Sequence, residues 1–272
     1  MAYTIKSYIA DPVEVGSADK YLSVALKTDG FTFTVFSGDR HLLHYCDVAL
    51  DTKGSIATIS SDIKALFAEK KIMTFGYKEA ELIATTELSS WLPEHLYERG
   101  RERQYLSMVG NTKPGTTCFS DYNELLKSYI VFSADSTAVS AFKITFPGIR
   151  VRCQYSKFVV ADFVQQNDPV MLLNIRQGLC DIVASSGGQL QLSNTYECPS
   201  QGDVMYRALT IVKSLGIGNT ALSLWLCGDI DKSVYDMFVK YFPQVKLYTG
   251  RPFTCQNEEF RNIHTYKDVL VF

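Results

Sequence analysis

Val170 to Pro199, VMLLNIRQGLCDIVASSGGQLQLSNTYECP, predicts three consecutive β-strands joined by glycine-containing turns. Tyr21 to Leu50, YLSVALKTDGFTFTVFSGDRHLLHYCDVAL, has the same pattern without a gap at an offset of 149 residues. In each stretch an apolar strand leads to a turn with Gly30 or Gly178, and a second apolar strand leads to a Ser-Gly turn. We interpret this as an internal duplication, which predicts two related lobes with a cleft between them.

Strand and helix patterns alternate through the rest of the chain. Thr58 to Lys70 has its apolar residues at helical spacing, which places Ile59, Ile63, Leu66 and Phe67 on one face. We also expect a helix over 94–108 and strands over 72–76 and 81–86. The alternation predicts an α/β protein with mixed sheets. Asp168-Pro169 precedes the second unit, so we place a first lobe at 1–168 and a second at 169–272.

Composition restricts the partners and the compartment. The formal net charge of -2 leaves no positive excess to neutralise a phosphate backbone, which argues against nucleic acid as a partner. The sequence shows neither a signal-peptide pattern nor an apolar stretch of about 20 residues, so we expect a cytoplasmic protein without a transmembrane segment. His41 and His44 stand three apart in a predicted strand and would point to opposite faces, so we expect no metal site there.

The second unit carries a family resemblance. Leu173 to Ala184, LNIRQGLCDIVA, aligns without a gap with L-D-I-G-G-G-T-T-D-I-A-V, a second-lobe pattern of bacterial division and pilus members of the actin-like ATPase superfamily. The identical positions are Leu173, Ile175, Gly178, Asp181 and Ile182. The order of elements is also similar across nearly the whole chain. The resemblance implies a duplicated ribonuclease H-like fold with two lobes, mixed sheets and an interlobe cleft.

Two narrower resemblances point to the same fold. Tyr129 to Phe163 resembles the pilus-assembly branch, in which a strand, a helix, a strand and a helix lead into the second lobe. The whole chain resembles an uncharacterised bacterial family, known mainly from Bacteroidales, that is described only as having an actin-like ATPase fold. This resemblance implies a fold and no activity.

The nucleotide motifs of the superfamily are altered in this chain. Asn174 stands where the resemblance places the metal-linked Asp, and Arg176 stands at the first glycine. The same offset puts Ala25 and Lys27 at those positions in the first lobe. The adenosine-side motif, Leu224 to Asp229, keeps one glycine, Gly228. A neutral amide lacks the charge with which a carboxylate holds hydrated Mg²⁺, and side chains at glycine positions block close approach of phosphate to the backbone.

These departures predict a non-hydrolysing binding or scaffolding protein, a pseudo-ATPase with a protein partner, no catalytic residue and no cofactor. The alternative is a divergent ATPase or kinase that uses ATP and Mg with carboxylates from Asp29, Asp181 or Asp229. Lys27 and Arg176 are either hairpin residues exposed to water or a facing pair that holds an anion other than Mg-ATP. The candidate cleft residues are Ala25, Lys27, Asn174, Arg176, Gly178, Gly228 and Asp229.

Overall fold

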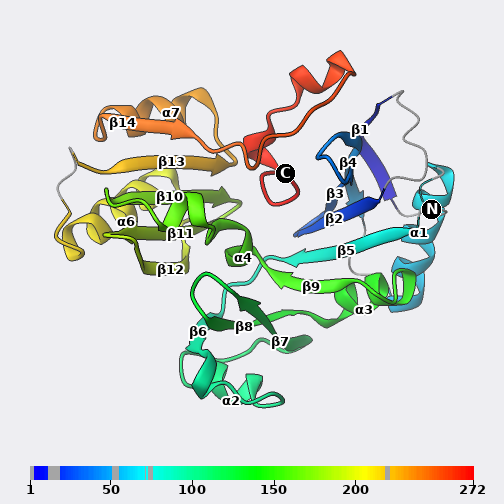
Figure 1. Cartoon of the computed structure of the whole chain (residues 1–272), viewed down its shortest axis with the longest axis horizontal. Coiled ribbons are helices and arrows are strands. Elements are labelled where there is room, and N and C mark those ends of the chain that lie inside the picture. The colour runs from blue at the N-terminus through cyan, green and yellow to red at the C-terminus, as the bar shows by residue number, and fades with distance from the viewer. Residues whose placement is uncertain (1–2, 12–18, 51–54, 71, 73–75, 218–220) are drawn as a thin grey trace.

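The computed structural model describes residues 3–11, 19–50, 55–70, 72, 76–217 and 221–272, which form two large sheets and one small sheet (Figure 1). The first large sheet has the order β1-β4-β3-β2-β5-β9. Its strands are β1 (Tyr3–Ala10), β2 (Lys20–Lys27), β3 (Gly30–Ser37), β4 (Leu42–Leu50), β5 (Tyr77–Ala84) and β9 (Arg150–Cys153). Helices α1 (Ile56–Glu69) and α3 (Ser136–Thr145) pack against each other beside this sheet.

The second large sheet repeats this plan, with the order β12-β11-β10-β13-β14. Its strands are β10 (Val170–Arg176), β11 (Leu179–Ser186), β12 (Gln189–Glu197), β13 (Ser223–Gly228) and β14 (Gln244–Leu247), with helices α6 (Gln201–Ser214) and α7 (Lys232–Val239). A small sheet, in the order β6-β8-β7, comprises β6 (Ser89–Pro93), β7 (Thr116–Asn123) and β8 (Ser128–Asp135). It lies beyond the first sheet together with the short helix α2 (Glu102–Ser107) (Figure 1).

The two predicted strand units are present as antiparallel meanders. Lys27 pairs with Gly30 at the end of the first hairpin, and Arg176 pairs with Leu179 at the end of the second. Each residue of the second pair lies 149 positions after its counterpart in the first pair, which is the offset found in the sequence. In each sheet the first strand of the meander also pairs in parallel with a later strand, β2 with β5 and β10 with β13. The predicted α/β class with mixed sheets is confirmed.

The long helices form where capping and apolar spacing agree. In α1 the Ser55 side chain accepts a hydrogen bond from the Thr58 amide, and the predicted apolar face is buried. In α6 Ser200 and Asp203 form a capping box. None of the helices in the described ranges combines the length and the apolar content needed to span a bilayer.

Two expected elements differ from the sequence prediction, and a third is largely untested. The helix over 94–108 is wrong: a 3-10 turn at Glu94–Leu96 and the short α2 are separated by Gly100, whose φ of +90° interrupts a right-handed helix. Of the strand expected over 81–86, residues 81–84 belong to β5, which runs from Tyr77 to Ala84, and residues 85 and 86 lie beyond it. Most of the strand expected over 72–76 lies outside the described residues.

The C-terminal segment 248–272 returns from the second sheet to the first. The Thr34 hydroxyl donates to the Val271 carbonyl at 2.8 Å, and the Tyr45 hydroxyl donates to Asp268 at 2.8 Å. Phe272 stacks on Tyr45, with ring centroids 5.7 Å apart. The segment lies between the two sheets in Figure 1. The division at residue 168 stays a prediction, and this segment adds contacts that cross it.

Candidate functional site

A cavity of about 370 Å³, here called the interlobe pocket, lies where the β2–β3 and β10–β11 hairpins approach the end of β13 and the C-terminal segment. It brings together six of the seven predicted cleft residues: Ala25, Lys27, Asn174, Arg176, Gly228 and Asp229. Gly178 lines a neighbouring cavity next to α6 instead. Residues from both lobes and from the C-terminal segment therefore share one surface.

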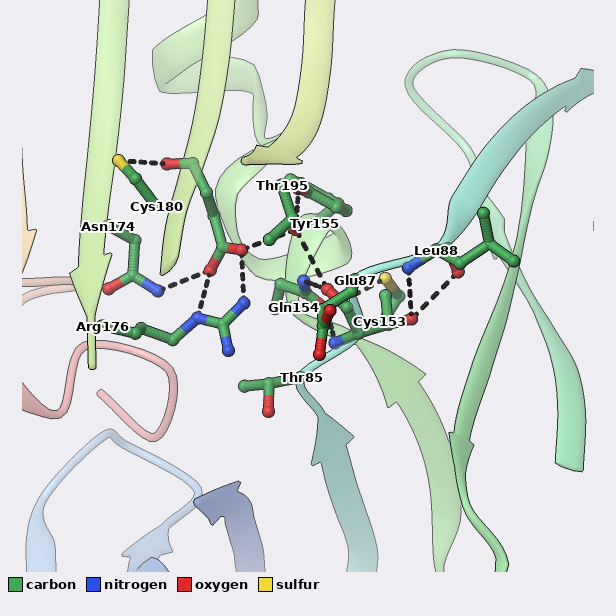
Figure 2. A network of polar contacts seen from close by, with 12 residues as sticks. Thr85, Glu87, Leu88, Cys153, Gln154, Tyr155, Asn174, Arg176, Cys180 and Thr195 are labelled. Atoms are coloured by element: carbon green, nitrogen blue, oxygen red, sulfur yellow. Dashed lines mark hydrogen bonds and ion pairs between the residues drawn. The ribbon is translucent and has the colours of Figure 1, made fainter. Parts of the chain in front are cut away.

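Asp181 on β11 anchors the second-lobe side of this pocket. Its carboxylate is fully buried and accepts a bidentate pair from Arg176, with Nε at 2.8 Å and Nη2 at 2.6 Å. The Asn174 amide donates to it at 2.9 Å and the Thr195 hydroxyl at 2.8 Å. Burial lowers the pKa of Arg176, but the Asp181 charge outweighs it and raises the pKa overall. The Arg176 guanidinium is therefore bound within its own lobe (Figure 2).

Both polar atoms of the Asn174 side-chain amide form hydrogen bonds. Its Nδ2 donates to Asp181, and its Oδ1 accepts from the Cys227 thiol at 3.6 Å. The residue is only 4% exposed. At this position an acidic residue would offer a charged oxygen to a metal, whereas the amide oxygen here is neutral and already has a donor. In the described part of the chain, no group of three His, Cys, Asp or Glu side chains is placed to hold a metal ion.

Lys27 on the first-lobe side is bound to two carboxylates. Its Nζ lies 2.9 Å from Asp47 Oδ1 and 2.7 Å from Asp268 Oδ1. Asp268 also accepts from the Thr32 hydroxyl at 3.0 Å. Burial lowers the pKa of Lys27, but Asp268 and Asp47 outweigh it and raise the pKa overall. The C-terminal segment thus supplies a counter-charge for the first-lobe hairpin.

The charges that line the interlobe pocket balance. Four cationic side chains, Lys6, Lys27, Arg176 and Lys267, face four carboxylates, Asp29, Asp47, Asp229 and Asp268. Lys27 and Arg176 line the same pocket, but their side chains are 31% and 20% exposed and each is paired with acidic groups. They are therefore not free hairpin residues in water, and both cations are already bound to carboxylates of this chain.

A polar network links this site to the junction of the lobes. The Thr86 carbonyl, just past β5, accepts from Gln154 at 2.8 Å, and it lies 3.0 Å from the Thr195 hydroxyl, whose single proton goes either to this carbonyl or to Asp181. The Tyr155 hydroxyl lies 2.7 Å from the Thr195 hydroxyl. Figure 2 shows Thr195, Tyr155 and Gln154 in line between the second sheet and the first. The Asp181 cluster therefore takes part in holding the two lobes together.

Sequence reasoning missed Asp47, Thr195 and Asp268. Asp47 had a signal, because it is a lone carboxylate in the apolar stretch Leu42–Leu50 and such a group needs a partner when buried. Asp268 had none, because its segment has neither helical nor strand spacing. Its place beside Lys27 depends on how the chain returns after β14.

The fold is similar to those of solved structures, one of which is described as having an actin-like ATPase fold. One is a protein from Bacteroides thetaiotaomicron with an actin-like ATPase fold and unknown function; it has a TM-score of 0.70 and 20% sequence identity, covering 85% of this chain and 91% of that chain. The PilM-PilN type IV pilus biogenesis complex matches with a TM-score of 0.58 and 10% identity, covering 92% of this chain and 96% of the other. The predicted actin-like fold is confirmed.

The sequence comparison assigns the family. No curated protein matches this chain. A family profile matches residues 13–245, which is most of the chain. The chain belongs to the family described as "Protein of unknown function (DUF3822)".

Proposed function

We propose that this chain is a non-hydrolysing actin-like protein that binds or scaffolds another protein. The observation that carries the proposal is the bidentate Arg176–Asp181 pair. Arg176, at the end of β10, stands where the resemblance places a glycine for phosphate contact. An ATPase of this fold needs bare backbone and an acidic metal ligand there. Here the Arg176 guanidinium is already paired with Asp181, and the Asn174 amide already donates a hydrogen bond to the same carboxylate.

The energetic cost of displacing Arg176 also supports a protein that does not hydrolyse ATP. A Mg-nucleotide that displaced Arg176 would leave the fully buried Asp181 carboxylate without its counter-ion. Removal of one partner from a buried ion pair costs about 3–5 kcal/mol. A triphosphate in the interlobe pocket would also meet four carboxylates that balance the four cations. The lining therefore has no net positive charge to attract a polyanion such as ATP.

Thermal unfolding with Mg-ATP tests the proposal. We expect the same midpoint for the wild-type protein in 2 mM Mg-ATP and in 2 mM MgCl₂ alone. Binding at 100 times Kd would stabilise the folded protein by about 2.7 kcal/mol and raise the midpoint by several degrees. A rise of that size with Mg-ATP and not with MgCl₂ would contradict the proposal.

One observation favours the alternative, a divergent ATPase or kinase. Asp229 lines the interlobe pocket directly after β13, and its carboxylate has no ion pair among the contacts within the described ranges. Asp181 cannot play this part because its carboxylate is fully engaged, and Asp29 is paired with Lys6 at 2.6 Å on the exposed side.

A phosphate-release assay separates the two functions. We expect the wild-type protein and Asp229→Asn to release phosphate from Mg-ATP at the same rate as buffer. The substitution preserves the size of the side chain and removes its charge, so a catalytic carboxylate would lose activity by orders of magnitude. Turnover in the wild type that disappears in Asp229→Asn would establish the enzymatic alternative.

A protein partner is the second part of the proposal. The support is that PilM, which shares this fold, occurs in a complex with PilN. This similarity supports a role for the chain as one subunit of an assembly. The partner of this chain need not resemble PilN, because 10% identity carries the fold alone.

A further inference from the structure

A second cavity, here called the basic pocket, has a volume of about 380 Å³ and lies on the first-lobe sheet beside the C-terminal segment. Side chains from β2, the end of β3, β5, β9 and helix α4 (Gln154–Phe158) line it. Four cationic side chains, Arg40, Arg152, Lys157 and Arg251, face it together with two carboxylates, Glu79 and Glu81. Unlike the interlobe pocket, this lining has a cationic surplus.

The floor of the basic pocket is an internally neutral cluster. Glu81 binds Lys157 Nζ, accepts from Arg152 Nη1 at 3.4 Å and accepts from the Ser23 hydroxyl at 2.8 Å. Arg152 also pairs with Asp121 at 3.0 Å, from outside the lining. Burial raises the pKa of Glu81, but Lys157 and Arg152 outweigh it and lower the pKa overall. These two cations are therefore matched by two carboxylates.

Arg40 and Arg251 remain against Glu79, the other carboxylate named in the lining, so the surplus is one positive charge. No carboxylate within the described residues forms an ion pair with either guanidinium. Arg40 has a left-handed backbone, with φ of 64°, and its guanidinium lies over the Phe36 ring at 4.3 Å from the centroid. It donates from Nη2 to the Arg251 carbonyl at 3.4 Å. Burial and then the like charge of Arg251 lower the pKa of Arg40, so the two cations destabilise each other.

Two polar groups at this pocket lack partners among the residues that the structure describes. The Ser156 hydroxyl is buried, with the residue 6% exposed, and no described residue forms a hydrogen bond with it. The same holds for the buried Arg40 Nε. Both residues line the cavity. Buried polar groups in folded proteins are almost always satisfied, so donors left open around a cavity indicate a ligand with acceptor oxygens.

We propose that the basic pocket binds a small organic oxyanion, a carboxylate or a phosphate ester, with its charged group between Arg40, Arg251 and Ser156. The apolar part of the ligand contacts Phe36 and Val269, which also line the cavity. The volume falls in the range of small-molecule sites, about 300–1,000 Å³. The site does not depend on the proposed function, because its cations are different from those of the interlobe pocket.

Titration calorimetry with three probes of matched shape tests the site: phenyl phosphate, benzoate and neutral benzyl alcohol. We expect saturable binding of at least one of the two anions to the wild type and none of benzyl alcohol. Arg40→Gln and Arg251→Gln each weaken that binding 10-fold or more. Arg99→Gln, which removes an exposed arginine next to α2, leaves it unchanged. The tighter anion identifies the natural headgroup.

The urea midpoint of each variant distinguishes a variant that loses binding because it unfolds from one that loses only the anion site. Arg251 is exposed, so its substitution is expected to leave the urea midpoint unchanged and to report on binding alone. The proposal is overturned if neither anion binds saturably, or if Arg251→Gln binds as tightly as the wild type and Arg99→Gln. It is also overturned if benzyl alcohol binds as well as the anions.

Discussion

Asp181→Leu is expected to lower the free energy of unfolding by about 3–5 kcal/mol. The substitution removes the acceptor of Arg176, Asn174 and Thr195 at a position that is fully buried. The Arg176 guanidinium then stays largely buried without a counter-charge, since its side chain is only 20% exposed. Urea unfolding at neutral pH, followed by circular dichroism, measures the change.

A second substitution distinguishes the loss of the ion pair from the loss of packing. The double variant Asp181→Leu/Arg176→Met removes both charges, and buried ion pairs replaced by apolar side chains are often neutral or stabilising. We expect the double variant to recover most of the lost stability. If it is as unstable as Asp181→Leu, the destabilisation comes from packing and not from the unpaired arginine.

Gly228→Ala is expected to cost about 3 kcal/mol or more. A Cβ built on Gly228 would lie 2.0 Å from the Ile175 carbonyl oxygen and 2.8 Å from Asn174 Oδ1, and the residue has φ of +88°. The end of β13 would have to move away from β10 at the floor of the interlobe pocket. Chemical denaturation of the purified variant gives the loss.

Gly178→Ala is the matched control. Gly178 also has a positive φ, of +72°, but a Cβ there meets nothing within 4 Å. Only the backbone strain applies, which is about 1–2 kcal/mol for an ordinary residue in the left-handed region. Equal losses for the two variants would show that close strand packing is not what requires a glycine at Gly228.

The fold was largely predictable because strand spacing and turn glycines are local signals. The hairpin ends at Gly30 and Gly178 lie at the predicted positions, and the predicted apolar face of α1 is buried. The helix expected over 94–108 failed because apolar spacing does not reveal the extended backbone at Tyr97 or the positive φ of Gly100. The return of residues 248–272 to the first sheet was not predicted, because long-range contacts determine it.

Six of the seven predicted cleft residues line the interlobe pocket, and their role in binding stays a prediction. The strand pattern and the resemblance both locate the ends of the two hairpins. The partners of Lys27 and Arg176 could not be assigned, because ion pairs depend on side-chain direction and on distant segments such as the one that carries Asp268. The basic pocket had no sequence signal, because its cations lie on separate elements and form no motif.

Lys27 and Arg176, the cations of the interlobe hairpins, are bound by carboxylates of this chain, and we propose that they leave no site for Mg-ATP. A crystal structure of the protein grown with millimolar Mg-ATP tests it directly. We predict that the Arg176–Asp181 and Lys27–Asp268 pairs remain as found, at 2.6 and 2.7 Å, with no nucleotide between the lobes. A triphosphate with Mg²⁺ beside Asn174, and Arg176 turned away from Asp181, would contradict the account.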